Sequence, residues 1–274
     1  MNISNTQNLP GKKGIAIVTG ASAGLGAVYA DRLAGRGYDL ILVARRADRL
    51  EAMSQRLRTK HGIEVKILVA NLTERKDLER IITEISANPN ITLLVNNAGN
   101  ATLAPAPSLN DEQIDAMHKL NVDALVGLSQ VALRKFLERD SGTIINVGSV
   151  LSFQTIGLSA VYSGTKGYVL NFTRGLQIAA EGTNVKVQLV LPASTATELW
   201  DLSGVPLANL NQSSVMTAEH CVDAALAGLD QGEAVTLPSV ENKQLWDAFE
   251  AARTNLFAAT QTGKPASRYA VESA

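Results

Sequence analysis

Cysteine is nearly absent from this chain of 274 residues, in which Cys221 is the only one. A single cysteine cannot form an internal disulfide, and it excludes metal sites that are rich in thiolates. Histidine is also scarce: His61, His118 and His220 are the only three, and none forms a pair with metal-ligand spacing. We therefore expect packing or surface roles for the histidines and no metal site.

Long apolar runs and an excess of one charge sign are missing as well. No run of about 18 apolar residues is present, so no membrane span is predicted. The first twelve residues lack the apolar core and the small-residue cleavage site of a signal peptide. The 25 basic and 26 acidic residues are spread evenly, which predicts neither nucleic acid nor a membrane as a partner. The expectation is a cytoplasmic enzyme or binding protein.

The chain does contain a regular alternation of short β-branched runs and longer amphipathic segments. Hydrophobic residues make up 46% of it, which is enough for a sizeable core. The short runs are almost continuously apolar, as is typical of strands buried on both faces of a parallel sheet. Residues 233–238 are a candidate seventh run after six clear ones. The six lie at residues 14–19, 39–44, 64–70, 91–96, 142–148 and 185–191.

The segments between these runs have helical patterns and helix-end signals. Leu50, Met53 and Leu57 recur at spacings of three and four. Gly62 follows them as a C-cap, and Asn110, with a glutamine three residues later, resembles a capping box. Strand and helix in repeated alternation predict a doubly wound α/β fold of the Rossmann type. Its sheet has six to seven mostly parallel strands, with helices on both faces.

One domain over residues 1–274 is the simplest organisation for this pattern, because the crossover helices must pack on both faces of one sheet. No repeat, low-complexity segment or linker divides the chain. Residues 1–12 and 262–274 lack a periodic pattern, so we expect them to be loosely held ends.

A glycine-rich turn, TGASAGLG, occupies residues 19–26 directly after the first run. Gly20 permits a tight turn, Gly24 lets the main chain approach a bulky anion, and Gly26 lets the next helix pack closely on the sheet. The start of that helix offers free N–H groups and a positive dipole end to a pyrophosphate. Glycine-rich turns are common, but this one follows a strand and opens a helix, which favours a dinucleotide site.

Tyr162 and Lys166 lie four positions apart in the stretch VYSGTKGY. On a helix this spacing places both side chains on one face. A nearby ammonium favours the phenolate, so we expect Lys166 to lower the pKa of Tyr162 from its ordinary value near 10. Tyr162 then exchanges a proton with a carbonyl oxygen. The alternative is that Tyr162 is a core residue at a helix start and Lys166 a surface charge.

Further motifs accompany this pair in a fixed order. The glycine turn reads T-G-x-x-x-G-x-G, NNAG at residues 96–99 ends the fourth run, and Asn121 lies within KLNVDAL. Ser149 lies 13 residues before Tyr162, and LPASTAT follows the sixth run. With these motifs the chain resembles the short-chain dehydrogenase/reductase family over about residues 13–200.

The resemblance implies a catalytic role for four residues. Tyr162 is implied as the acid–base residue, and Ser149 as the residue that holds the substrate oxygen. Lys166 is implied to bridge the hydroxyls of the nicotinamide ribose. Asn121 is implied to anchor a water that passes protons to Lys166. Together they form a donor cluster at the position where alkoxide charge develops.

A nicotinamide cofactor follows from the same resemblance, and NADP(H) is favoured over NAD(H). Arg45 and Arg46 end the second run, where a carboxylate is expected in an NAD site. Guanidinium groups bind a 2′-phosphate, although one of the two arginines is expected to be a solvated charge. The residues expected to contact the cofactor are Gly20, Ser22, Ala23, Gly24, Leu25, Gly26, Arg45, Arg46, Asn71, Leu72, Asn97, Ala98, Gly99, Tyr162, Lys166, Pro192, Thr195 and Thr197.

The chain departs from the family pattern at several positions. Ala23 stands where some NADP-using relatives have a basic residue, and Asn71 where an aspartate is usual near the adenine. Ala193 replaces a glycine after Pro192, and Gly164 replaces a common alanine inside the catalytic motif. None of these departures removes a catalytic group.

Substrate choice is expected to depend on residues 194–216, which follow the sixth run where ligands meet such sheets. The apolar residues of this lid predict a substrate with a hydrophobic body, such as an aryl, alkyl or alicyclic ketone. The alternative is that they only pack over the cofactor. They are Leu199, Trp200, Leu202, Val205, Leu207, Leu210 and Met216.

A second amphipathic segment lies near the C-terminus, with Leu245, Phe249, Ala252 and Leu256 at helical spacing. It either covers the sheet of its own chain or meets a second subunit. The resemblance implies a homodimer or homotetramer that assembles through the helices carrying Asn121 and Tyr162.

The function predicted from these residues is an NADP(H)-dependent oxidoreductase that interconverts a ketone or aldehyde and an alcohol. One alternative is a non-catalytic, dinucleotide-binding redox sensor, but such proteins typically lose the tyrosine or the lysine, and both are present here. Sugar-nucleotide epimerisation or dehydration is disfavoured, because relatives with that chemistry are usually longer and have a differently spaced glycine turn.

Overall fold

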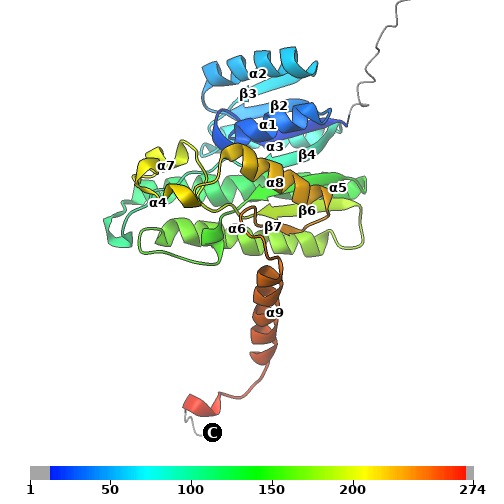
Figure 1. Cartoon of the computed structure of the whole chain (residues 1–274). Helices are drawn as coiled ribbons and strands as arrows, with labels where there is room; N and C mark the ends of the chain where they lie inside the picture. Colours follow the sequence, from blue (N-terminus) through cyan, green and yellow to red (C-terminus); the bar gives the residue numbers. More distant parts are fainter. Residues whose placement is uncertain (1–12, 270–274) are drawn as a thin grey trace, which may run out of the picture. The chain divides into compact units, whose positions relative to one another are not determined.

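The computed structural model describes residues 13–269 and shows a seven-stranded sheet with helices on both faces (Figure 1). The chain divides into two compact units, the first ending at Ser239 and the second beginning at Val240. The sheet belongs to the first unit. That residues 1–274 form a single domain stays a prediction.

All neighbouring strands pair in parallel, in the order β3-β2-β1-β4-β5-β6-β7. The predicted doubly wound α/β fold is therefore confirmed, and the sheet includes the seventh strand expected near residues 233–238. The strands are β1 (Ile15–Thr19), β2 (Asp39–Ala44), β3 (Val65–Val69), β4 (Ile91–Asn96), β5 (Gly142–Val147), β6 (Val185–Val190) and β7 (Val235–Thr236).

Helices of the first unit cover both faces of this sheet. They are α1 (Gly24–Gly35), α2 (Ala47–His61), α3 (Arg75–Ala87), α4 (Asp111–His118), α5 (Leu125–Glu138), α6 (Ala160–Ala179), α7 (Leu199–Leu202) and α8 (Ala218–Asp230). On β1, Ala16 and Val18 belong to the core beneath α1, α2 and α8, whereas Ile17 belongs to the core beneath α3, α5 and α6. Because both faces are covered, the strands are apolar along most of their length.

The strand order reverses at β1, which lies between β2 and β4. The chain leaves β1 toward one side of the sheet and leaves β4 toward the other. A crevice opens outside the carboxyl ends of strands at such a switch point, and ligands of doubly wound folds bind there. The glycine turn follows β1 and the NNAG motif ends and follows β4, so the topology brings both to this crevice.

Helix ends follow the signals in the sequence. Gly62 closes α2 in the left-handed conformation, with φ of 67°. Asn110 Oδ1 accepts a hydrogen bond from the Gln113 backbone, and the Gln113 side chain accepts one from the Asn110 backbone, which completes the predicted capping box of α4. Leu50 and Leu57 are fully buried on the inner face of α2, as their spacing predicts.

The second unit contains α9 (Gln244–Ala259), none of whose residues is buried. Leu245, Leu256 and Phe257 on this helix are each about two-thirds exposed. Residues 262–269 are exposed, whereas residues 1–12 and 270–274, which complete the predicted loose ends, lie outside the described residues. Among residues 13–269, no helix is long and apolar enough to cross a membrane.

Candidate active site

The glycine turn takes the shape that its composition predicts. Gly20 and Gly24 have positive φ values of 66° and 53°. A Cβ atom at Gly26 would lie 2.3 Å from the Gly20 carbonyl oxygen, so α1 packs against the turn only because this residue has no side chain. Ala23 provides no side-chain cap for α1, and the first turn of the helix contains no acidic residue. Its N–H groups therefore suit a phosphate.

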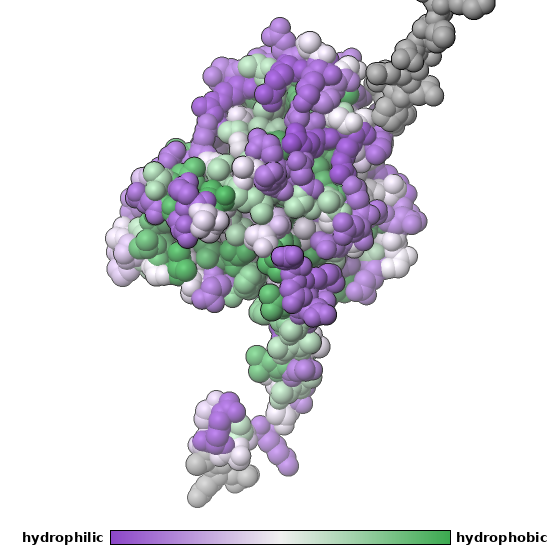
Figure 2. All heavy atoms as spheres, in the orientation of Figure 1, coloured by the Kyte–Doolittle hydropathy of each residue, from purple (hydrophilic) through white to green (hydrophobic). Residues whose placement is uncertain are grey.

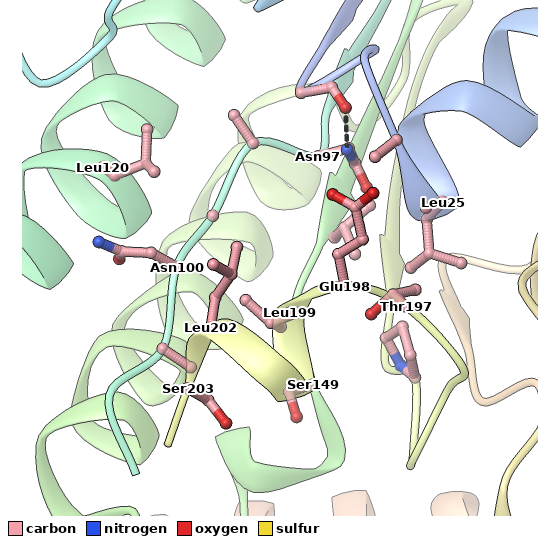
Figure 3. Close-up of a pocket in the computed structure, with 18 of the residues that line it drawn as sticks. Leu25, Asn97, Asn100, Leu120, Ser149, Thr197, Glu198, Leu199, Leu202 and Ser203 are labelled. Carbon is pink, nitrogen blue, oxygen red and sulfur yellow. Dashed lines mark hydrogen bonds between the residues drawn. The ribbon is translucent and has the colours of Figure 1, made fainter. Parts of the chain in front are cut away.

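Asn97 and Ala98 brace this turn from the end of β4. Asn97 Nδ2 donates to the carbonyl oxygens of Thr19 at 3.0 Å and Gly20 at 3.4 Å, and Figure 3 draws the Asn97 side chain at the pocket wall. The backbone N–H groups of Asn97 and Ala98 both donate to Thr19 Oγ1 at 3.0 Å. The two strand ends at the switch point are thus held as one rigid wall.

Asn121 lies in a π-helical turn, η2 (Lys119–Ala124), between α4 and α5. Such single wide turns inside helices are frequent at functional sites. The buried side chain accepts a hydrogen bond from the Asn100 backbone at 2.9 Å and donates to the Asn100 carbonyl oxygen at 2.9 Å and Thr165 Oγ1 at 3.1 Å. Asn121 therefore ties the loop after β4 to α6.

Ser149, Tyr162 and Lys166 are all buried and line the same cavity. Tyr162 and Lys166 lie on one face of α6, and Ser149 follows β5 and precedes the short 3₁₀ turn η3 (Val150–Ser152). Lys166 Nζ donates to the Val147 carbonyl oxygen at 2.9 Å and lies 5.7 Å from the centre of the Tyr162 ring. The alternative interpretation, in which Lys166 is a surface charge, is excluded because Lys166 is buried.

Burial, not the lysine, has the largest effect on the pKa values of this pair. It raises the pKa of Tyr162 to about 12, against a smaller lowering by hydrogen bonding with Ser149. It lowers the pKa of Lys166 to about 8. The expected lowering of the Tyr162 pKa by Lys166 is therefore wrong for this structure. The physical reason is that burial favours the neutral form of each group, and Lys166 Nζ is turned to a backbone carbonyl.

A cavity of about 520 Å³ extends from the glycine turn to Tyr162. Figure 3 draws part of its wall, including Leu25, Asn97 and Ser149. Every residue expected to contact the cofactor lines this cavity except Gly26, which is packed behind the turn. Asn121 does not line the cavity either, because Gly99 lies between them. A Cβ atom at Gly99 would lie close to both Asn121 Oδ1 and Lys166 Nζ. The roles of these residues stay predictions.

Arg46 is the more firmly held of the two arginines after β2. Its Nε and Nη2 atoms donate to Ser22 Oγ at 3.2 and 3.0 Å. Nη1 donates to Glu198 Oε2 at 2.8 Å, and Arg49 Nη1 donates to the other oxygen of the same carboxylate at 2.5 Å. Arg45 lines the cavity beside them. Arg49 and Glu198 were not predicted as site residues, because they form an ion pair across 149 positions of the sequence.

The lid, residues 194–216, consists of α7 and short 3₁₀ turns. Trp200 Nε1 donates to the Thr195 carbonyl oxygen at 2.9 Å, and the Leu103 backbone N–H donates to the Ser203 carbonyl oxygen at 2.8 Å. Hydrophobic side chains gather beside α7 on the surface, whereas hydrophilic ones cover α2 (Figure 2). Of the seven apolar residues named in the sequence, those that line the cavity are Leu199, Trp200 and Leu202.

Several apolar residues of the cavity wall were not anticipated, and the larger ones include Leu103, Leu120, Leu151 and Ile156. Leu103 follows β4, Leu120 lies in η2, and Leu151 and Ile156 follow β5. They come from three separate connections and share no motif, so only the assembled sheet brings them together. Leu103, Leu151 and Leu199 pack against the buried cluster that contains Tyr162.

Comparison with known proteins agrees with this geometry. The family model described as short chain dehydrogenase matches residues 14–204. A very-long-chain 3-oxoacyl-CoA reductase from Anas platyrhynchos is 33% identical over 199 residues, which are 71% of this chain and 64% of that protein. The chain thus spans less than two thirds of the length of this curated relative.

Two solved structures cover nearly the whole fold. A short-chain dehydrogenase from Sphingobium yanoikuyae in complex with NADPH is 38% identical, with a TM-score of 0.89 over 92% of this chain and 98% of that one. A bulky-bulky ketone specific alcohol dehydrogenase from Comamonas testosteroni is 33% identical, with a TM-score of 0.85 over 93% and 98% of the two chains.

Proposed function

The chain belongs to the short-chain dehydrogenase family, and from this premise we propose that it is an NADP(H)-dependent oxidoreductase that interconverts a ketone or aldehyde and an alcohol. The observation that carries the proposal is one continuous cavity. It has a phosphate-binding glycine turn and Arg46 at one end and the hydroxyls of Ser149 and Tyr162 at the other.

In this proposal the residues of the chain supply position and protons. The bound nicotinamide supplies the hydride that reaches the carbonyl carbon. Ser149 holds the carbonyl oxygen by a hydrogen bond, and Tyr162 donates its phenolic proton to that oxygen as charge develops. The pKa of about 12 keeps Tyr162 protonated until charge develops on the substrate oxygen. Lys166, with a pKa of about 8, exchanges protons near neutral pH.

The cofactor preference rests on Arg46 and its neighbours. Arg46 is held beside Ser22 and the glycine turn, so a 2′-phosphate there meets a guanidinium and a hydroxyl donor. The family binds nicotinamide cofactors, and the Sphingobium relative was solved with NADPH. Both observations support NADP(H) over NAD(H).

The substrate class rests on the apolar wall beside Ser149 and Tyr162. Leucine, isoleucine and tryptophan side chains from four connections suit a substrate with a hydrophobic body. The name of the Comamonas relative refers to bulky ketones, and that of the Anas relative to very-long-chain oxoacyl groups. Aryl, alkyl or alicyclic ketones are therefore the proposed class.

Consumption of NADPH, followed beside NADH against aryl, alkyl and alicyclic ketones and small sugars, tests this proposal. We expect turnover of ketones with a preference for NADPH. A clear preference for sugars would contradict the substrate class. Tight NADPH binding without any turnover would favour the redox sensor, a reading that the presence of both Tyr162 and Lys166 disfavours.

Assembly and location extend the same proposal. Many members of this family form oligomers, and a homodimer or homotetramer is proposed here, with the helices that carry Asn121 and Tyr162 at the interface. A single domain over residues 1–274 and a cytoplasmic location stay predictions from the sequence. No metal, membrane or nucleic acid has a part in the proposed reaction.

A further inference from the structure

Glu198 occupies a position at which the function proposed above has no use for a carboxylate. It directly precedes α7 and lines the cavity, and its side chain extends from the lid into the pocket (Figure 3). Its two oxygens accept separate hydrogen bonds, Oε2 from Arg46 at 2.8 Å and Oε1 from Arg49 at 2.5 Å. Arg46 and Arg49 therefore share the Glu198 carboxylate as an anionic partner.

The donors around this carboxylate match those that a phosphate requires. Two guanidinium groups and the Ser22 hydroxyl converge on one region beside the glycine turn. A 2′-phosphate carries the same charge sign and the same kind of acceptor oxygens as a carboxylate, and Arg binds both in the same planar geometry. A carboxylate and a phosphate held side by side on Arg46 would repel each other, so binding of one disfavours binding of the other.

Glu198 is ionised when it holds these arginines. Hydrogen bonds from Arg46 and Arg49 are the main causes that keep the pKa of its carboxyl below the ordinary value. The side chain is 46% exposed, so each ion pair is partly screened and can be exchanged for another at modest cost. The Glu198 carboxylate can therefore compete with a phosphate for the two arginines.

We propose that Glu198 is a specificity-determining residue: its carboxylate holds Arg46 and Arg49 in the cofactor-free protein, and the 2′-phosphate of NADP(H) displaces it. The inference rests on the proposed NADP(H) preference. NAD(H) carries a hydroxyl at that position, so it leaves Glu198 on the arginines. Glu198 therefore lowers the affinity for NADP(H) and leaves that for NAD(H) unchanged.

Displacement of the Glu198 carboxylate is also expected to affect the lid, because Glu198 directly precedes α7. The Glu198 carbonyl oxygen accepts from the Leu202 backbone N–H at 3.2 Å, and Trp200, two residues further, lines the cavity. Exchange of the carboxylate for a phosphate thus frees the start of α7 from the arginines. NADP(H), but not NAD(H), is then expected to change the surroundings of Trp200.

Isothermal titration of NADP⁺ and NAD⁺ into the full chain tests the competition, since the two ligands differ only at the 2′ position. We expect Glu198→Gln to bind NADP⁺ about 3- to 10-fold more tightly than the wild type, the equivalent of two exposed ion pairs. NAD⁺ affinity is expected to stay unchanged. Asp201→Asn removes the same charge from the same lid at an exposed position and serves as the matched control, with both affinities unchanged.

Trp200 fluorescence provides a second readout, measured in a Trp246→Phe background because the chain has two tryptophans. NADP⁺ is expected to shift the Trp200 emission of the wild type more than NAD⁺ does. The cofactor-free Glu198→Gln variant is expected to emit as the NADP⁺ complex does. Weaker or unchanged NADP⁺ binding by Glu198→Gln would overturn the inference, because Glu198 then positions the arginines or is not involved. A wild type that binds NAD⁺ as tightly as NADP⁺ contradicts the proposed cofactor instead.

Discussion

Tyr162 and Lys166 are both more than nine-tenths buried, with exposed fractions of 8% and 6%. The positions of these residues, and of Ser149 beside them, could be predicted from motifs in the sequence. Their pKa values could not. The direction of each shift depends on how completely the site excludes water and on the carbonyl to which Lys166 Nζ is turned, and neither is encoded in a spacing of four residues.

The buried Lys166 makes stability depend on pH with a definite sign. Its folded-state pKa of about 8 lies below the ordinary 10.5, so the unfolded chain binds the extra proton between these values. The cost of burying the charged lysine is therefore full below pH 8 and relieved as the pH rises toward 10.5. Relative to Lys166→Met, the wild type is expected to gain up to about 3 kcal/mol in free energy of unfolding across this window.

Urea unfolding of wild type and Lys166→Met at pH 7, 8, 9 and 10 measures this difference. Tyr162 is present in both proteins, so its own titration, with a pKa of about 12, cancels. A difference in the free energy of unfolding that does not change with pH would show that the protonation of Lys166 is the same in both states.

Arg45 and Arg46 are adjacent but are predicted to differ in their effect on the cofactor. Arg46 is fixed by Ser22 and Glu198, whereas Arg45 is exposed at the rim of the cavity. Arg46→Ala is expected to weaken NADP⁺ binding on the order of 10-fold and leave NAD⁺ binding unchanged. Arg45→Ala serves as the control, with a smaller loss. Equal losses, measured by titration calorimetry, would remove the distinction between the two arginines.

At the scale of elements, two helical glycines have opposite surroundings. A Cβ at Gly26 in α1 would meet the Gly20 carbonyl oxygen at 2.3 Å, whereas one at Gly164 in α6 would meet nothing within 4 Å. Gly26→Ala is therefore expected to destabilise the fold by about 1–3 kcal/mol and to distort the glycine turn. Gly164→Ala is expected to stabilise it by about 1 kcal/mol, since alanine favours a helix.

Thermal unfolding of the two variants beside the wild type checks both signs. Gly164→Ala is expected to raise the midpoint by about 2–4 °C and Gly26→Ala to lower it. The same substitution is made in both cases, so only the surroundings differ. A lower midpoint for Gly164→Ala would mean that α6 needs the small residue next to Tyr162.

Strands and helix ends were the elements that the sequence predicted best. Continuous apolar runs identify buried strands, and Gly62 and Asn110 mark helix ends through strictly local hydrogen bonds. The π-helical turn around Asn121 and the short turns of residues 194–216 were not foreseen. Their shapes depend on contacts with distant loops, such as those of Asn121 with Asn100 and Thr165.

At the scale of the whole molecule, the switch between β1 and β4 explains why the site lies where it does. Motifs separated by more than a hundred residues meet there because parallel strands end at one edge of the sheet. Which apolar residues face the cavity could not be read from the sequence. Val205 and Leu207 belong to the same lid as Leu199 but do not line the wall.

Assembly can be tested by two matched substitutions of exposed apolar residues. Ile178 on α6 is 66% exposed and Leu256 on α9 is 69% exposed. If the helices carrying Asn121 and Tyr162 form the interface, Ile178→Glu reduces the mass in light scattering to that of one chain, 29.0 kDa. Leu256→Glu is then expected to retain the mass of the oligomer. The reverse result would place the interface on α9.

Transfer of deuterium from NADPH that carries deuterium at both C4 positions of the nicotinamide tests the central claim most directly. With an aryl ketone as substrate, the alcohol is expected to carry deuterium on its carbinol carbon, as mass spectrometry will show. Tyr162→Phe is expected to form this product about 10²- to 10⁴-fold more slowly, which is the typical contribution of a general acid, with NADP⁺ binding unchanged. An alcohol without deuterium, or undiminished turnover by Tyr162→Phe, would contradict the account.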